Sequence, residues 1–214
     1  TVRQPPQRKP RASATGSSRK SRRLLIVAAV VLGSALLRSF YLQGYPIPSR
    51  SMADTLLLGD HVLVHKSSSL PEPGDVVLFE SPEDPDRAFI KRCVAVAGQR
   101  IEIRDKVVYV DGERLADSRF SKYLDARILP VTRGARDNLP VRTVPAGHVF
   151  VLGDNRDNSR DSRHWGFLSV GALLGKPLFI YFSAEANGDS AGFGDRLTSL
   201  LARIRWHRLG AAIE

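Results

Sequence analysis

Short runs of strand-forming residues fill most of the chain after residue 60. Turn residues such as Pro73-Gly74-Asp75 and Asp111-Gly112 separate these runs. β-Branched and aromatic residues favour strands, and no helical period competes with them in this part of the chain. We therefore expect a mainly β, mostly antiparallel domain. The expected strand segments are 61–65, 75–80, 89–96, 100–110, 148–152 and 177–182.

Basic charge is concentrated at the two ends of the chain. The first 23 residues hold eight Lys or Arg and no acidic residue, which supplies most of the net charge of +10. The last twenty residues contribute the remaining +2, so residues 24–194 are neutral overall. A sequence pI of about 10.2 would suit a nucleic-acid-binding protein. Because the body of the chain carries no basic excess, we expect no nucleic-acid partner.

An apolar segment follows the basic N-terminus directly. Residues 24–37 carry no charge, and the sequence stays semi-apolar after Arg38. A bilayer span takes about 20 residues, and Arg38, Phe40 and Tyr41 suit a position at the membrane interface. No small-residue cleavage site follows, so we expect a transmembrane anchor at 24–44 rather than a cleaved leader. The basic flank then places the N-terminus in the cytoplasm and the rest of the chain outside.

These observations divide the chain into consecutive parts. Within the C-terminal part, Leu197, Leu200, Leu201 and Ile204 share one face at the helical period. That short amphipathic helix could pack on the β-domain or lie on an anionic membrane surface. The expected parts are a disordered basic tail at 1–23, the anchor at 24–44, a β-rich domain at 45–183 with a loop-rich insertion at 113–141, and a C-terminal tail at 184–214.

Ser51 and Lys91 are a candidate nucleophile and base. Ser51 follows a rigid segment that contains Pro46 and Pro48. A serine hydroxyl needs a base at neutral pH. In the strand expected at 89–96, Lys91 would lie among apolar neighbours such as Cys93, and loss of hydration would lower its pKa toward that of a useful base. The single cysteine, Cys93, is expected to be a buried apolar residue.

The long polar loop GDNRDNSRDSRHWG also has an alternative interpretation as a calcium site. Asp157, Ser159 and Asp161 alternate as calcium ligands do in an EF-hand. However, Ser162 stands where such a loop needs Gly, and Leu168 stands where it needs Glu. The five histidines have no zinc-binding spacing. We expect neither a metal nor a cofactor.

Taken together, three motifs resemble the bacterial type I signal peptidases, the Ser/Lys-dyad proteases of peptidase family S26. The motifs are SMADTL beginning at Ser51, IKR around Lys91, and the GDNRDNSRDSRHWG loop. The resemblance covers the anchor and residues 46–182. It implies an antiparallel coiled-sheet catalytic domain of the signal-peptidase/LexA-like type. It also implies that signal peptides of exported preproteins are the substrates.

The resemblance assigns a role to each motif residue. Ser51 would be the nucleophile and Lys91 the general base, and the Ser49 hydroxyl would join the Ser51 N–H in the oxyanion hole. Ser159 would orient the lysine. Asp161 would form a supporting ion pair in the same loop, and its partner is Arg163.

One position departs from the family pattern. Asp54 stands where the family has proline. Its carboxylate could oppose the oxyanion, raise the pKa of Lys91 or cap a turn. This departure leaves two alternatives open: a specialised Ser/Lys processing peptidase for one secretion or conjugation substrate, and an inactive membrane-tethered signal-peptide-binding β-domain.

We expect a monomeric, single-pass protein of the cytoplasmic (inner) membrane with its catalytic domain on the outer face. Its expected partners are signal peptides and the lipid bilayer.

Overall fold

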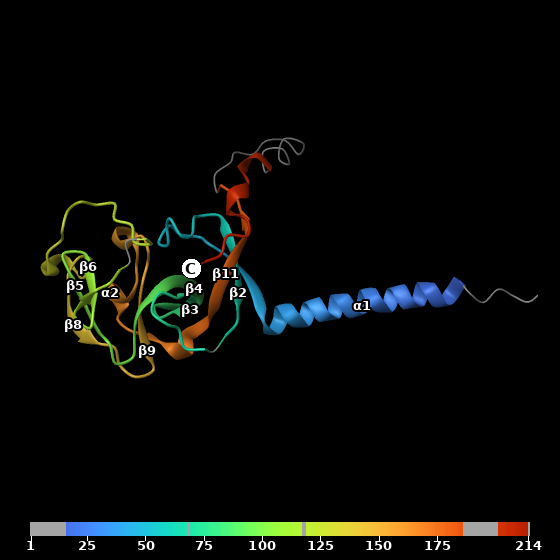
Figure 1. The fold of residues 1–214 in the computed structure, drawn as a ribbon, viewed down its shortest axis with the longest axis horizontal. Helices are drawn as coiled ribbons and strands as arrows, with labels where there is room; N and C mark the ends of the chain where they lie inside the picture. The colour runs from blue at the N-terminus through green and yellow to red at the C-terminus, as the bar shows by residue number, and fades with distance from the viewer. Residues whose placement is uncertain (1–15, 68, 117–118, 186–200, 214) are drawn as a thin grey trace, which may run out of the picture. The chain divides into compact units, whose positions relative to one another are not determined.

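The computed structural model describes residues 16–67, 69–116, 119–185 and 201–213 (Figure 1). The chain separates into two units, residues 1–40 and residues 41–214.

The first unit contains one long helix, α1 (Gly16–Phe40). Its apolar side chains from Leu24 to Leu32 are exposed. No helix within the described residues is both long and apolar enough to cross a membrane. The helix begins at Gly16, so part of the segment expected as a disordered tail is helical. Lys and Arg, which are frequent there, are good helix formers.

The second unit is built from strands that are joined by turns and longer loops (Figure 1). Short helices lie in its connections: η1 (Val131–Arg133), η2 (Arg156–Asn158), α2 (Ser162–Trp165), η3 (Val170–Ala172) and η4 (Trp206–Arg208). The strands are β1 (Leu42–Pro46), β2 (Asp60–His65), β3 (Val76–Ser81), β4 (Asp84–Val96), β5 (Arg100–Arg104), β6 (Val107–Val110), β7 (Glu113–Arg114), β8 (Leu139–Thr143), β9 (His148–Leu152), β10 (Leu168–Ser169) and β11 (Leu173–Ser183).

The strands form two sheets. The larger sheet has the order β1-β2-β11-β3-β4-β9-β10, and the smaller has the order β7-β6-β5-β8. Every pair of neighbouring strands in both sheets is antiparallel. The expectation of a mainly β, antiparallel fold is therefore confirmed.

Several boundaries differ from the sequence prediction; β4, for example, begins at Asp84 and β11 at Leu173, both earlier than expected. The anchor was expected to continue to residue 44, but from Leu42 onward the chain pairs with β2, because backbone hydrogen bonds along β2 favour a strand there. The run expected at 100–110 is a hairpin, since Asp105 and Lys106 turn the chain with φ of 47° and 72°. The insertion expected at 113–141 is framed by β7 and β8, which pair with β6 and β5.

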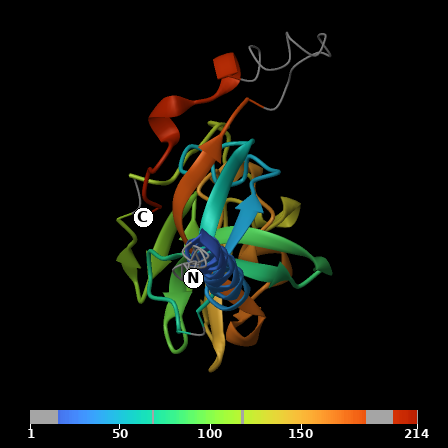
Figure 2. The same cartoon turned by 90° about the vertical axis from the view of Figure 1, so that its right-hand side faces the viewer.

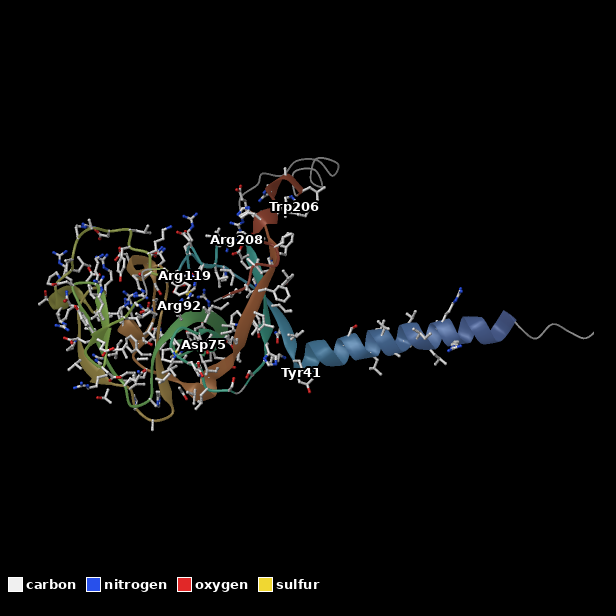
Figure 3. All side chains as sticks on the ribbon, in the orientation of Figure 1. Tyr41, Asp75, Arg92, Arg119, Trp206 and Arg208 are labelled. Carbon is white, nitrogen blue, oxygen red and sulfur yellow. The ribbon has the colours of Figure 1, made fainter. Side chains whose placement is uncertain are left out.

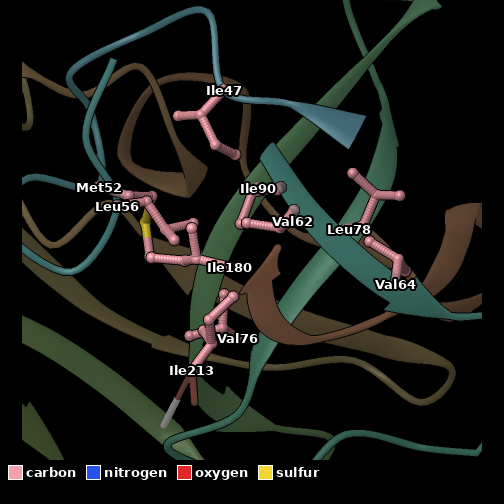
Figure 4. Close-up of a cluster of buried hydrophobic side chains, with 10 residues drawn as sticks. All are labelled: Ile47, Met52, Leu56, Val62, Val64, Val76, Leu78, Ile90, Ile180 and Ile213. Carbon is pink, nitrogen blue, oxygen red and sulfur yellow. The ribbon is translucent and has the colours of Figure 1, made fainter. Parts of the chain in front are cut away.

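Buried apolar side chains form three clusters. One cluster joins the two sheets through residues such as Val94 and Phe150 on the larger sheet and Ile101 on the smaller. Another lies on β3, β4 and β9 and includes Cys93. The third contains the residues that directly follow Ser51 (Figure 4). Its members are Ile47, Met52, Leu56, Val62, Val64, Val76, Leu78, Ile90, Ile180 and Ile213.

The end of the chain packs on the second unit, where a tail was expected. Ile204 forms a β-bridge with Ala184, and Ala212 forms one with Phe179. In Figure 2 the red C-terminal segment runs beside the orange strand β11. Of the amphipathic helix expected at 197–204, residues 201–203 are helical and residues 197–200 lie outside the described part of the chain.

Candidate active site

Ser51 and Lys91 meet in the folded chain. The Lys91 Nζ donates a hydrogen bond of 2.7 Å to the Ser51 Oγ, although the two residues are 40 positions apart. The same Nζ donates to the carbonyl oxygen of Ile90 at 3.1 Å. Lys91 is only 4% exposed, whereas Ser51 lies on a half-buried turn between β1 and β2. The predicted nucleophile and base are thus within hydrogen-bonding distance.

The position of Lys91 in the sheet explains its burial. Lys91 lies in β4 opposite Val77 of β3, and its Nζ is 5.5 Å from the centre of the Phe89 ring. Strict alternation along β4 would place Ala95 on the same face as Lys91, Phe89 and Cys93, but the strand is irregular there. A shift in the β4–β9 register after Cys93 places Ala95 in the cluster between the sheets.

Burial sets the protonation of this lysine. Loss of hydration lowers the pKa of Lys91 to about 8, while the carboxylates of Asp161 and Asp154 act in the opposite direction. A lysine with such a pKa supplies a useful fraction of neutral amine near neutral pH. Burial acts the other way on the nearby thiol, since it raises the pKa of Cys93 to about 12. Cys93 therefore stays protonated, as a buried apolar residue would.

Ser49 lies beside the nucleophile. Its Oγ is 3.1 Å from the Ser51 Oγ, and either hydroxyl can donate. Both serines and Lys91 line a cleft whose other walls are mostly apolar. The cleft has a volume of about 90 Å³ and is lined by Tyr45, Pro46, Ile47, Pro48, Ser49, Ser51, Met52, Leu56, Leu78, Arg87, Ala88, Phe89, Ile90 and Lys91.

The supporting pair predicted in the polar loop is formed. Arg163 donates to both carboxylate oxygens of Asp161, at 2.9 Å and 2.8 Å, and both side chains are buried. Asp161 also accepts a hydrogen bond of 3.0 Å from the backbone N–H of Gly153. This bond joins the start of the polar loop to a residue near its end. These donors hold the pKa of Asp161 below its usual value against the opposing effect of burial.

Ser159 does not make the contact expected from the resemblance. Its Oγ is buried and forms no well-aligned hydrogen bond with Lys91, whose Nζ is directed to Ser51 and Ile90. Ser159 instead packs over Gly153. A Cβ on Gly153 would approach the Ser159 Oγ to 2.2 Å and the Ser51 carbonyl oxygen to 2.6 Å. Glycine is thus required where the polar loop passes the nucleophile.

A buried ion pair next to Lys91 was not predicted. Arg92, which is labelled in Figure 3, donates to both oxygens of Asp154, at 2.9 Å and 2.8 Å, and also to the carbonyl oxygen of Gly74. Asp154 accepts a further hydrogen bond of 2.6 Å from Thr55. This pair ties β4 to the polar loop and to the turn after the nucleophile. The IKR and GDN motifs contained both residues, but their sequence spacing gave no indication that they pair.

Asp54 is paired with a cation other than Lys91. Its exposed carboxylate forms an ion pair with Lys122, at 2.7 Å and 2.8 Å from the Nζ. The charges that act on the pKa of Lys91 are those of Asp161, Asp154 and Arg163. The structure therefore gives no support to the suggestion that Asp54 raises the pKa of this lysine.

Comparison with known proteins identifies the family that this sequence matches. Over residues 19–182 the sequence matches the family described as "Signal peptidase, peptidase S26". The Synechocystis protein named "Probable signal peptidase I-1" is 38% identical over 179 residues, which cover 79% of this chain and 85% of the relative. Signal peptidase I of Aquifex aeolicus is 31% identical over 209 residues, which cover 73% and 82%. A solved signal peptidase I structure from Enterococcus faecalis aligns with a TM-score of 0.40 at 28% identity, over 51% of this chain and 98% of its own.

Proposed function

This chain belongs to the signal peptidase family, peptidase S26, and on that premise we propose that Ser51 and Lys91 carry out the family's reaction. The chain is a hydrolase of the signal peptidase I type, and the family removes signal peptides from preproteins. The observation that carries the proposal is the 2.7 Å hydrogen bond between a buried lysine and the serine hydroxyl.

In the first step the neutral amine of Lys91 accepts the proton of the Ser51 hydroxyl. The Oγ attacks the scissile carbonyl carbon, and the developing oxyanion accepts hydrogen bonds from the Ser51 N–H and the Ser49 hydroxyl. When the intermediate collapses, the C–N bond breaks and the Lys91 ammonium returns the proton to the leaving amine. The products of this step are an acyl-enzyme on Ser51 and a free amino terminus.

In the second step water replaces the leaving amine. Lys91, neutral again, accepts a proton from the water, whose oxygen attacks the acyl carbon. The ester bond to Ser51 breaks, and the proton returns to the Oγ. A pKa of about 8 leaves about a tenth of Lys91 neutral at pH 7, which is enough for a base that is used in both steps.

The cleft beside the two residues supports a peptide substrate. Its apolar walls, which include Ile47 and Ile90, suit the residues that precede the cut. By analogy with the family, small residues such as Ala would occupy the first and third positions before the cut. No step of the proposed reaction uses Asp54, and the cleavage experiment decides between this reaction and the alternative of an inactive relative.

We propose that the enzyme is monomeric and acts at the outer face of the cytoplasmic membrane. The exposed apolar side chains of α1 from Leu24 to Leu32, next to a basic segment, support attachment of this helix to lipid. Protease added outside intact spheroplasts should reach residues after 44 and leave the basic N-terminus intact. Protection of the domain with digestion of the N-terminus would reject this orientation.

The reaction is tested with the full chain in detergent and a preprotein that carries its signal peptide. Mass spectrometry of both products should locate one cut, after a small residue at the end of the signal peptide. Ser51→Ala is the matched control and should give no product. A wild-type chain that binds the preprotein without cutting it would support the inactive binding protein instead.

A further inference from the structure

The C-terminal segment from residue 203 to residue 213 lies outside the part of the chain that matches the family, residues 19–182. It nevertheless forms ordered contacts with the second unit. The backbone of Ile180 in β11 donates to the Ala211 carbonyl oxygen at 3.0 Å and accepts from the Gly210 N–H at 2.8 Å. Ile213 N–H donates to the Leu178 carbonyl oxygen at 3.0 Å. The segment therefore lies beside β11, joined to it by these backbone hydrogen bonds and by an isolated β-bridge between Ala212 and Phe179.

Two arginines of this segment converge on one buried carboxylate. Asp60, at the start of β2, is fully buried. Arg208 donates to both of its oxygens, at 3.2 Å and 2.7 Å, and Arg205 donates to the Oδ1 at 3.3 Å. Ser183 donates a further hydrogen bond of 2.7 Å to the Oδ1, and the Leu57 N–H donates one of 2.8 Å to the Oδ2. Two cations on one buried carboxylate form a connected network rather than an exposed pair.

The same guanidinium groups also hold the turn that follows the nucleophile. Arg208 donates to the carbonyl oxygen of Thr55 at 2.9 Å, and Arg205 donates to that of Leu58 at 2.8 Å. Residues 50–59 belong to no strand, so their position depends on such contacts. Figure 3 labels Arg208 in the C-terminal segment close to β11.

An apolar contact adds to the polar ones. Ile213 belongs to the same buried cluster as Met52 and Leu56, which lie one and five positions after Ser51 (Figure 4). The segment thus touches the nucleophile turn through its arginines and reaches the core beneath that turn through its last apolar residue. Ser51 itself is held from the other side, by the backbone N–H of Asn155 at 3.0 Å.

We infer that Arg205 and Arg208 are positioning residues, through which the C-terminal segment holds the Ser51 turn in register with Lys91. This inference rests on the proposed function. Catalysis depends on the placement of reacting groups, and a displacement of about 1 Å can reduce the rate about 100-fold. A purely stabilising segment would instead leave the rate constant of the folded enzyme unchanged.

The test compares Arg205→Gln, Arg208→Gln and the double variant in the full chain. We expect kcat for preprotein cleavage to fall about tenfold in each single variant and about 100-fold in the double variant, with KM within about twofold of wild type. Arg208→Lys keeps a positive charge beside Asp60 but lacks the branched guanidinium group that bonds Asp60 and Thr55 at the same time. The kcat of this variant should therefore lie between those of wild type and Arg208→Gln. If the double variant fails to fold, Arg208→Lys still tests the inference, because it changes fewer contacts.

Arg203→Gln is the matched control. Arg203 lies in the same segment and donates to the Glu185 carbonyl oxygen, but it makes no contact with Asp60 or the turn. Its kcat should equal that of wild type. A second readout is the rate at which a small serine-directed acylating probe labels Ser51, which should fall by the same factors as kcat.

Two results would overturn the inference: folded variants with wild-type kcat and labelling rate, or the same loss of kcat in Arg203→Gln. Failure of the proposed function would show in a different measurement, the cleavage of a preprotein by the wild-type chain. If the wild-type chain cut no preprotein, the probe would still report whether Arg205 and Arg208 control the reactivity of Ser51.

Discussion

The backbone N–H of Asn155 donates a hydrogen bond of 3.0 Å to the carbonyl oxygen of Ser51. The Asn155 side chain adds a second bond from its Nδ2 to the Arg50 carbonyl oxygen, at 3.1 Å. The polar loop after β9 therefore donates hydrogen bonds to two successive carbonyl groups of the turn, those of Arg50 and Ser51. Since Asp154 in the same loop binds Arg92, the neighbour of Lys91, one loop contacts the segments that carry both the proposed nucleophile Ser51 and the proposed base Lys91.

Replacement of Asn155 by Ala should lower kcat about tenfold. The substitution removes the side-chain bond to Arg50 and leaves the backbone bond to Ser51, so the nucleophile is loosened but not released. Steady-state kinetics on a peptide substrate measure the change. Asn138→Ala is the matched control, since the Nδ2 of Asn138 bonds the Leu129 carbonyl oxygen away from the site. An equal loss of kcat in the control would contradict a specific role for Asn155.

Removal of either member of the dyad should abolish cleavage. Ser51→Ala lacks the nucleophile, and Lys91→Ala lacks the base. Lys91→Arg should be equally inactive, because arginine is not deprotonated in proteins and cannot accept the serine proton. Product formation by mass spectrometry and the circular dichroism of each variant provide the measurement. Substantial turnover by Lys91→Arg would rule out the proposed role of the lysine.

Activity should rise with pH through a midpoint near 8. The required form of Lys91 is the neutral amine, so the rate should increase about tenfold per pH unit below its pKa of about 8 and level off above it. The measurement is kcat/KM across this range. Asp54→Asn should leave the midpoint unchanged, since the Asp54 carboxylate pairs with Lys122. A clear shift in that variant would assign Asp54 an influence on the base.

Lys91→Met should be inactive but more stable than wild type at pH 7. The folded-state pKa of Lys91 lies below its unfolded value, so the unfolded chain binds more protons between pH 8 and about 10.5, and wild-type stability increases over that range. Below pH 8 the folded protein bears the full cost of the buried ammonium, about 3 kcal/mol. Methionine removes most of this cost. Thermal unfolding at pH 7 should show a Tm a few degrees higher, and the gain should shrink at higher pH.

Asp154→Ala should lower the free energy of unfolding by about 3–5 kcal/mol. The substitution leaves the Arg92 guanidinium buried without its carboxylate, and a buried charge that loses its partner is costly. Combining it with Arg92→Met should recover part of the loss. Denaturant unfolding measures both variants. Glu102→Ala, which breaks the exposed pair with Arg104, should cost less than about 1 kcal/mol. If Asp154→Ala and Glu102→Ala lowered the free energy of unfolding by similar amounts, the structural importance of the buried Arg92–Asp154 pair would be contradicted.

The sequence alone indicated the β-rich fold, because β-branched and aromatic runs separated by Gly and Pro turns express local preferences. It also indicated Ser51, Lys91, Asp161 and Arg163, because their motifs are contiguous short patterns.

The tertiary structure decided which residues meet. The 2.7 Å contact of Lys91 with Ser51 and the pair of Arg92 with Asp154 join segments that are 40 and 62 positions apart. Such distances depend on strand register, including the shift after Cys93, and no local pattern encodes them. The network of Asp60 with Arg205 and Arg208 was missed for the same reason. A basic C-terminal sequence is typical of a solvated tail, and only the folded structure shows that this segment packs against β11.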